Sequence, residues 1–154
     1  MPTITPFLWY DNQAEEAMDL YTSIFKNAKV LSVNKAQGRT IAVSFELEGQ
    51  QFTALNGGPH HKFSEATSFF VACTTQQEID HYWTNLTADG GEPGRCGWLK
   101  DKFGVSWQIV PTALGEMLGD KDPAKGQRVL TAMLQMKKLD LGELQNAYDG
   151  KVSA

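Results

Sequence analysis

The sequence FLWYDNQAEEAMDLYTSIF (Phe7–Phe25) contains a predicted strand followed directly by a predicted helix, and this strand–helix pair decides the fold. Ile4–Tyr10 is rich in aromatic and β-branched residues, which favours a strand. Asp11-Asn12 then supplies a turn and a helix N-cap. Over Ala14–Phe25 the apolar residues recur at steps of three and four, which predicts an amphipathic helix.

Three strands are predicted after this helix, over residues 29–36, 40–47 and 51–55. The second of them alternates apolar and polar residues with a period of two, which is typical of a half-buried strand. Asn56-Gly57-Gly58-Pro59 ends the third strand. The first part of the chain therefore has the order β-α-β-β-β.

The same order then begins again. SFFVAC (Ser68–Cys73) predicts a strand, and Thr75 with Glu78 forms a capping box at the start of a second amphipathic helix. Short strands are predicted over residues 95–99 and 105–110. At an offset of 62 residues, FFVACTTQQEIDHYWTNLT (Phe69–Thr87) matches the opening stretch in residue type, pairing Phe7 with Phe69. We therefore predict a βαβββ unit that occurs twice.

Beyond Pro111 the pattern becomes helical. Helices are predicted over residues 112–118, 123–136 and 141–148. A helical tail added to a completed sheet commonly covers a sheet edge or docks on a partner subunit.

Composition restricts the class of function. The chain has 154 residues, a net charge of −4 and 42% hydrophobic residues, as in an ordinary globular domain. The negative charge disfavours binding to nucleic acid, and no apolar stretch reaches the 18 residues of a membrane span. Two cysteines without metal or redox spacing, and the lack of a signal-peptide pattern, predict a cytoplasmic protein.

The repeated unit, the opening stretch, ALNGGP (residues 54–59) and CGWLKDKFGVSWQIVP (residues 96–111) together resemble the vicinal oxygen chelate superfamily, which includes glyoxalases, bleomycin resistance proteins and dioxygenases. The likeness is to the PhnB-like branch, known as 3-demethylubiquinone-9 3-methyltransferase domain proteins, and includes QMKKLD in the tail. It implies an α+β fold in which two βαβββ modules form a cup-shaped eight-stranded mixed sheet, followed by a helical C-terminal tail. It also implies a homodimer. We expect one domain over residues 1–154, with module one at about 3–58, module two at about 66–111 and the tail at about 112–150.

Enzymes of this superfamily hold a divalent metal with His and Glu on the inner strand faces. The resemblance puts the corresponding places of module one on Pro6 or Ile4 and on Ala54, with Asn56 on the same face. In module two they fall on Ser68 and Gln108. Only Gln108 and Asn56 can offer a ligand, each through a neutral amide oxygen. Catalytic metal sites need about three protein ligands, mostly imidazole, carboxylate or thiolate. We therefore expect neither a metal nor another cofactor.

The expected ligand-binding residues are Asn56, Ser68, Trp98 and Gln108. Trp98 is included because an aromatic ring on the pocket wall can stack on a ligand. By strand alternation, Trp107 should point away from Gln108 and pack under the helices. No catalytic residue is assigned, and His60, His61 and His81 are interpreted as surface residues. Cys96 is interpreted as an inert thiol, although Arg95 beside it leaves a reactive thiol open.

Three functions from different classes remain. The favoured one is a metal-free protein that binds a small, partly aromatic molecule in the sheet cleft. The second is a metal-dependent lyase, isomerase or dioxygenase, which the small number of candidate ligands opposes. The third is activity like that of a 3-demethylubiquinone-9 3-methyltransferase, which rests on the family description alone, because the chain lacks a Gly-rich strand–turn–helix motif for a nucleotide.

Overall fold

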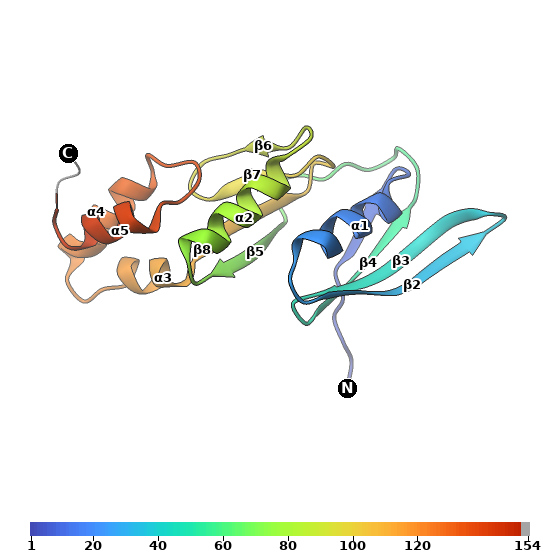
Figure 1. The fold of residues 1–154 in the computed structure, drawn as a ribbon, viewed down its shortest axis with the longest axis horizontal. Coiled ribbons are helices and arrows are strands. Elements are labelled where there is room, and N and C mark those ends of the chain that lie inside the picture. Colours follow the sequence, from blue (N-terminus) through green and yellow to red (C-terminus); the bar gives the residue numbers. More distant parts are fainter. Residues whose placement is uncertain (152–154) are drawn as a thin grey trace. The chain divides into compact units, whose positions relative to one another are not determined.

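In a computed structural model, which describes residues 1–151, the chain forms two compact units, one over residues 1–62 and one that begins at residue 63. Each unit has a four-stranded mixed sheet and a helix that follows its first strand. The predicted α+β class and the two βαβββ modules are therefore confirmed. Figure 1 shows both units as a ribbon.

The first unit consists of β1 (Phe7–Tyr10), α1 (Ala14–Ile24), β2 (Ala28–Ala36), β3 (Arg39–Leu47) and β4 (Gln50–Asn56). Its strands are ordered β1-β4-β3-β2, with β1 parallel to β4 and the other pairs antiparallel. One face of this sheet packs against α1. The buried side chains of that layer include Leu8, Tyr10, Val43, Phe45, Phe52 and Ala54 from the sheet and Ala17, Met18, Tyr21 and Ile24 from the helix.

The second unit begins with β5 (Ser68–Cys73), α2 (Gln76–Thr87), β6 (Glu92–Pro93), β7 (Trp98–Lys100) and β8 (Ser106–Pro111). Its strand order, β5-β8-β7-β6, repeats that of the first unit. The predicted capping box is present, since the Glu78 backbone N–H donates to Thr75 Oγ1 at 3.1 Å. Leu99, Trp107 and Ile109 are buried on one face of this sheet, as are Ile79 and Leu86 of α2.

The tail adds α3 (Thr112–Leu118), α4 (Pro123–Met133) and α5 (Leu141–Tyr148) to the second unit. These helices share a buried cluster with the end of β8, made of Val110, Leu114, Met117, Val129, Leu139 and Leu144. The predicted continuation of α4 to Met136 is wrong, because the backbone leaves the helix after Met133 and turns toward the sheet.

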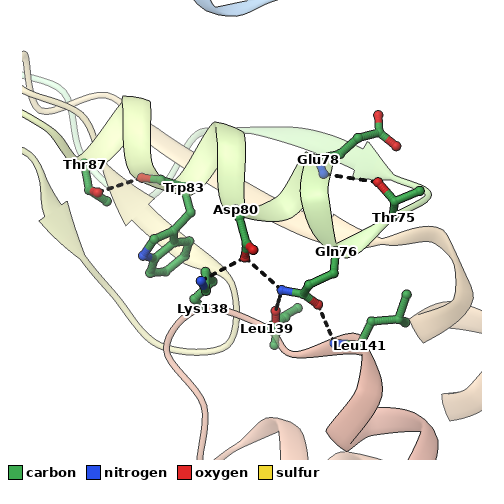
Figure 2. Close-up of polar contacts among 9 residues, drawn as sticks. All are labelled: Thr75, Gln76, Glu78, Asp80, Trp83, Thr87, Lys138, Leu139 and Leu141. Carbon is green, nitrogen blue, oxygen red and sulfur yellow. Dashed lines mark hydrogen bonds and ion pairs between the residues drawn. The ribbon is translucent and has the colours of Figure 1, made fainter.

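Hydrogen bonds from the segment between α4 and α5 connect the tail to α2 and to the turn before β7. The backbone N–H groups of Cys96 and Gly97 donate to the carbonyls of Met136 (2.9 Å) and Lys137 (2.8 Å). On α2, the Gln76 amide donates to the Leu139 carbonyl at 3.1 Å and accepts from the Leu141 N–H at 2.7 Å, as Figure 2 shows.

The repeat alignment is correct for the helices and wrong for the strands. At the offset of 62, buried Ala17 and Tyr21 match buried Ile79 and Trp83. Phe7, however, is exposed and lies on the face of its sheet that no helix of its unit covers, which we call the open face. Phe69, in contrast, contacts Trp107 on the helix-covered face of the second sheet. Three residues link β1 to α1 and only two link β5 to α2, so the strands are displaced by one residue.

The predicted N-cap of α1 is also wrong. The capping position is Gln13, whose side chain makes no capping bond. Asn56 Oδ1, from the end of β4, accepts from the Ala14 N–H at 2.8 Å and satisfies the helix end instead. A contact from a distant strand has thus replaced the local cap.

Candidate functional site

Three of the four expected site residues lie on one open face of the second sheet. Trp98 of β7 is opposite Gln108 of β8, and β8 is paired with β5, which carries Ser68. Side chains of a strand alternate between faces. Trp107 is accordingly buried on the opposite face, as predicted, while Gln108 is half-buried on the open one.

Gln108 occupies the centre of this face. Its amide Nε2 donates to Ser68 Oγ at 2.9 Å, and the register sets Phe70 and Trp98 on either side of it. The Phe70 side chain is 60% exposed. Among residues 1–151 no hydrogen bond reaches Gln108 Oε1, so this oxygen can accept one from a bound molecule. We call Ser68, Phe70, Trp98 and Gln108 the open-face cluster.

A cavity of about 220 Å³ adjoins the open-face cluster at Trp98. Ser106, Lys100 and Glu65 also line it. The Lys100 ammonium forms an ion pair with the Glu65 carboxylate at 2.5 Å, which raises the pKa of Lys100 and lowers the pKa of Glu65, chiefly through their hydrogen bond. Both side chains are partly exposed, so this ion pair contributes little to stability.

Ser106 stands out among the cavity-lining residues because its hydroxyl is buried without a partner. The residue is 1% exposed, and Ser106 Oγ has no hydrogen bond within the described part of the chain. An unsatisfied buried hydroxyl costs about 1–3 kcal/mol. The register places it between Ser68 on β5 and Lys100 on β7.

Asn56, the fourth expected residue, lies in the first unit, where Oδ1 accepts from the Ala14 N–H and Nδ2 donates to the Thr40 carbonyl at 3.1 Å. These bonds tie β3 and β4 to the start of α1. Asn56 also borders a separate polar cavity of about 580 Å³, which Glu15 and Arg39 line as well.

The turn between β7 and β8 contains a buried carboxylate that the sequence analysis missed. Asp101 is 2% exposed, and its Oδ1 accepts from the backbone N–H groups of Phe103 (2.9 Å) and Val105 (3.0 Å). Oδ2 accepts from Trp107 Nε1 at 2.9 Å. Asp101 therefore shapes the turn of DKFGVSWQI beneath the open face. The signal in the sequence was an Asp that opens a turn and precedes a Trp at a strand start.

The residues at the superfamily's ligand places do not suit a catalytic metal. Ala54 is fully buried on the helix-covered face, because the displacement of the strands by one residue moves it off the open face. The open-face positions of β1 and β4 are Phe7, Trp9, Thr53 and Leu55, which lack imidazole, carboxylate and thiolate groups. Across residues 1–151 no group of three His, Cys, Asp or Glu residues is placed to hold a metal ion.

The two thiols and the three imidazoles of the chain do not belong to the open-face cluster. Burial raises the pKa of the Cys73 thiol to about 11, and Cys96 is half-buried in the turn before β7. His60 and His81 are exposed. His61 is also exposed, and its ring is nearly perpendicular to that of Trp9, with 4.8 Å between the ring centroids.

Solved structures match this fold. A putative 3-demethylubiquinone-9 3-methyltransferase, PhnB protein, from Bacillus cereus is 32% identical with a TM-score of 0.66, covering 72% of this chain and 100% of its own. A glyoxalase/bleomycin resistance protein from Albidiferax ferrireducens T118 is 12% identical (TM-score 0.50, 71% and 97% covered). The fosfomycin resistance protein FosX from Listeria monocytogenes, solved with Mn(II) and sulfate, is 13% identical (TM-score 0.52, 70% and 87% covered). These similarities show that the chain has the fold of the vicinal oxygen chelate class.

The family follows from the sequence match. The model of the 3-demethylubiquinone-9 3-methyltransferase family matches residues 2–110, and the chain belongs to this PhnB-like family. The match stops before α3, so it does not include QMKKLD in the tail. A search of curated proteins finds no match. None of the helices within residues 1–151 is both long and apolar enough to cross a membrane.

Proposed function

We propose that this chain binds a small, partly aromatic molecule on the open face of its second sheet, without a metal. The observation that carries the proposal is the position of Gln108, held by Ser68 and set between Trp98 and Phe70. Binding sites for small molecules combine apolar and aromatic walls with a few fixed polar groups.

Each member of the open-face cluster has a distinct part in the proposal. Trp98 and Phe70 offer aromatic surface, and an exposed aromatic ring gains about 0.5–1.5 kcal/mol from an aromatic partner beyond burial alone. Gln108 Oε1 accepts a hydrogen bond from the ligand. Ser68 holds the Gln108 amide in one orientation, which reduces the ordering needed when the ligand binds.

The donor set supports the metal-free part of the proposal. The superfamily's ligand places in the second unit hold Ser68 and Gln108, a hydroxyl and a neutral amide, and those of the first unit hold apolar residues or Thr53. Divalent transition metals favour imidazole, carboxylate and thiolate ligands.

Calorimetric titration with 2-naphthol, a neutral aromatic alcohol, tests the proposal on protein freed of metal by a chelator. We expect measurable binding, with affinity reduced at least about tenfold in Gln108→Ala and in Trp98→Ala. Gln127→Ala, on an exposed part of α4, is the matched control and should bind as the wild type does.

Three results would overturn the proposal. Stoichiometric Zn, Ni, Mn or Fe in the purified protein would favour a metal-dependent enzyme. Tight binding of S-adenosylmethionine would favour methyl transfer. Unfolding of Gln108→Ala would show that Gln108 is a structural residue and that the site is misplaced.

We also propose that the protein is a cytoplasmic homodimer. In the first unit, the edge strand β2 exposes Val30, Leu31 and Val33, and exposed apolar edge strands commonly pair with another chain. Light scattering on the purified protein should give twice the mass of one chain, and Val33→Lys should reduce it to that of one.

A further inference from the structure

Building on the proposed function, we infer that the ligand is an aromatic carboxylate, and that Glu65 occupies the place of its carboxylate group in the free protein. The inference deepens the proposed site by extending it from the open-face cluster into the adjoining cavity. Trp98 lines both, so one molecule can lie against its ring and reach Lys100 and Ser106.

The cavity has the donors that a carboxylate requires. The Lys100 ammonium donates through three N–H bonds, and the Ser106 hydroxyl is buried with no partner in the described residues. The two residues face each other across β7 and β8. A carboxylate has two oxygens, so one can accept from Lys100 while the other accepts from Ser106.

Glu65 shows that Lys100 already binds a carboxylate in the free protein. Its carboxylate lies 2.5 Å from the Lys100 ammonium, and its side chain is 62% exposed. Glu65 belongs to the segment before β5 rather than to the sheet, so it can leave without breaking a strand. Ion pairs this exposed are weak, which makes exchange for a ligand carboxylate inexpensive.

The charges of the cavity favour this one-for-one exchange. Glu92 of β6 stands opposite Lys100 and also raises the pKa of Lys100. With both glutamates present, one ammonium faces two carboxylates, and an added anion would be repelled. When the ligand carboxylate replaces that of Glu65, the local charge is unchanged. Displacement of Glu65 is therefore part of binding.

A matched pair of probes, 2-naphthoate and 2-naphthamide, tests the inference by calorimetry, since they differ in charge and hardly in shape. We expect 2-naphthoate to bind at least about tenfold more tightly than 2-naphthamide. This preference should disappear in Lys100→Met and in Ser106→Ala, and return in Lys100→Arg. Glu65→Gln should raise the affinity for 2-naphthoate about fivefold and leave 2-naphthamide unchanged.

Glu116→Gln on α3 is the control for the loss of one negative charge and should bind both probes as the wild type does. Unfolding curves of each variant separate lost binding from lost folding. Equal affinities for the two probes, both dependent on Gln108, would overturn the carboxylate assignment and leave the proposed function standing. A preference that survives Lys100→Met would also overturn it. Failure of both probes and of 2-naphthol to bind would remove the proposed function as well.

Discussion

Asp101 accepts a hydrogen bond from the indole N–H of Trp107 at 2.9 Å, and both side chains are buried. The same carboxylate accepts two backbone N–H groups of the turn between β7 and β8. This relationship positions the strand that carries Gln108, because Trp107 precedes Gln108 on β8 and points to the other face. The position of Gln108 on the open face therefore depends on the buried hydrogen bond between Asp101 and Trp107.

Asp101→Asn should lower the free energy of unfolding by about 2–4 kcal/mol, because an amide nitrogen would then face an N–H donor in a buried place. Urea denaturation followed by tryptophan fluorescence measures the change. Asp89→Asn is the control, since Asp89 is exposed and has a left-handed backbone (φ 55°) that Asn tolerates. Equal stability of the two variants would show that the Asp101 network is dispensable.

Gln76→Ala should loosen the tail, because Gln76 bonds both the Leu139 carbonyl and the Leu141 N–H (Figure 2). We expect a loss of about 2 kcal/mol and faster hydrogen exchange over residues 137–148, with exchange in β8 less affected. Lys138→Met, which removes only the exposed ion pair with Asp80 at 2.8 Å, should cost less than about 1 kcal/mol. The reverse order of effects would contradict this account of docking.

Gly57→Ala should destabilise the first unit by about 1–3 kcal/mol, because its Cβ would lie 2.3 Å from the Trp9 ring. Displacing the ring would also break the bond from Trp9 Nε1 to the Gly58 carbonyl (2.9 Å). Gly115→Ala is the opposite case, since no atom lies within 4 Å of its Cβ and the residue is helical. It should stabilise by about 0.5–1 kcal/mol. Thermal unfolding of both variants tests the signs, and a stabilising Gly57→Ala would refute the packing argument.

Cys73 should resist alkylation in the folded protein, because burial raises the pKa of its thiol to about 11 and only the thiolate reacts. At pH 8 about one thiol in a thousand is then ionised. Iodoacetamide labelling followed by peptide mass spectrometry should show Cys73 modified far more slowly in buffer than in urea. The raised pKa also predicts that stability is retained below pH 9 and falls between about pH 9 and 11 as the unfolded thiol ionises first. Rapid labelling at pH 8 would contradict both statements.

The elements with strong local patterns could be predicted from the sequence. The helices over 112–118 and 141–148 have the predicted bounds, and so does the strand Ser68–Cys73. Strand alternation also correctly placed Trp107 and Gln108 on opposite faces. The errors lie where distant residues decide the local structure. Residues 95–97 were predicted as strand, but Cys96 and Gly97 adopt left-handed backbones and bond to the tail.

The candidate site was predictable only in part, for a related reason. Ser68, Trp98 and Gln108 share a face because of strand register, which alternation within each strand anticipates. The sequence did not point to Phe70, Ser106 or Lys100. Their positions beside Gln108 and Trp98 depend on which strands are neighbours, and the burial of the Ser106 hydroxyl depends on what packs over it. Asn56, the fourth expected residue, accepts a hydrogen bond from the start of α1, and its part in ligand binding stays a prediction.

Nuclear magnetic resonance titration of the metal-free, ¹⁵N-labelled protein with 2-naphthol tests the central claim most directly. The four tryptophans give separate indole N–H signals, and Trp98→Phe assigns the relevant one. The account predicts saturable shifts of the Trp98 indole and of the Gln108 amide, with a much smaller response from Trp107. Shifts that centre on Trp9 or Trp83, or no saturable shift, would contradict it.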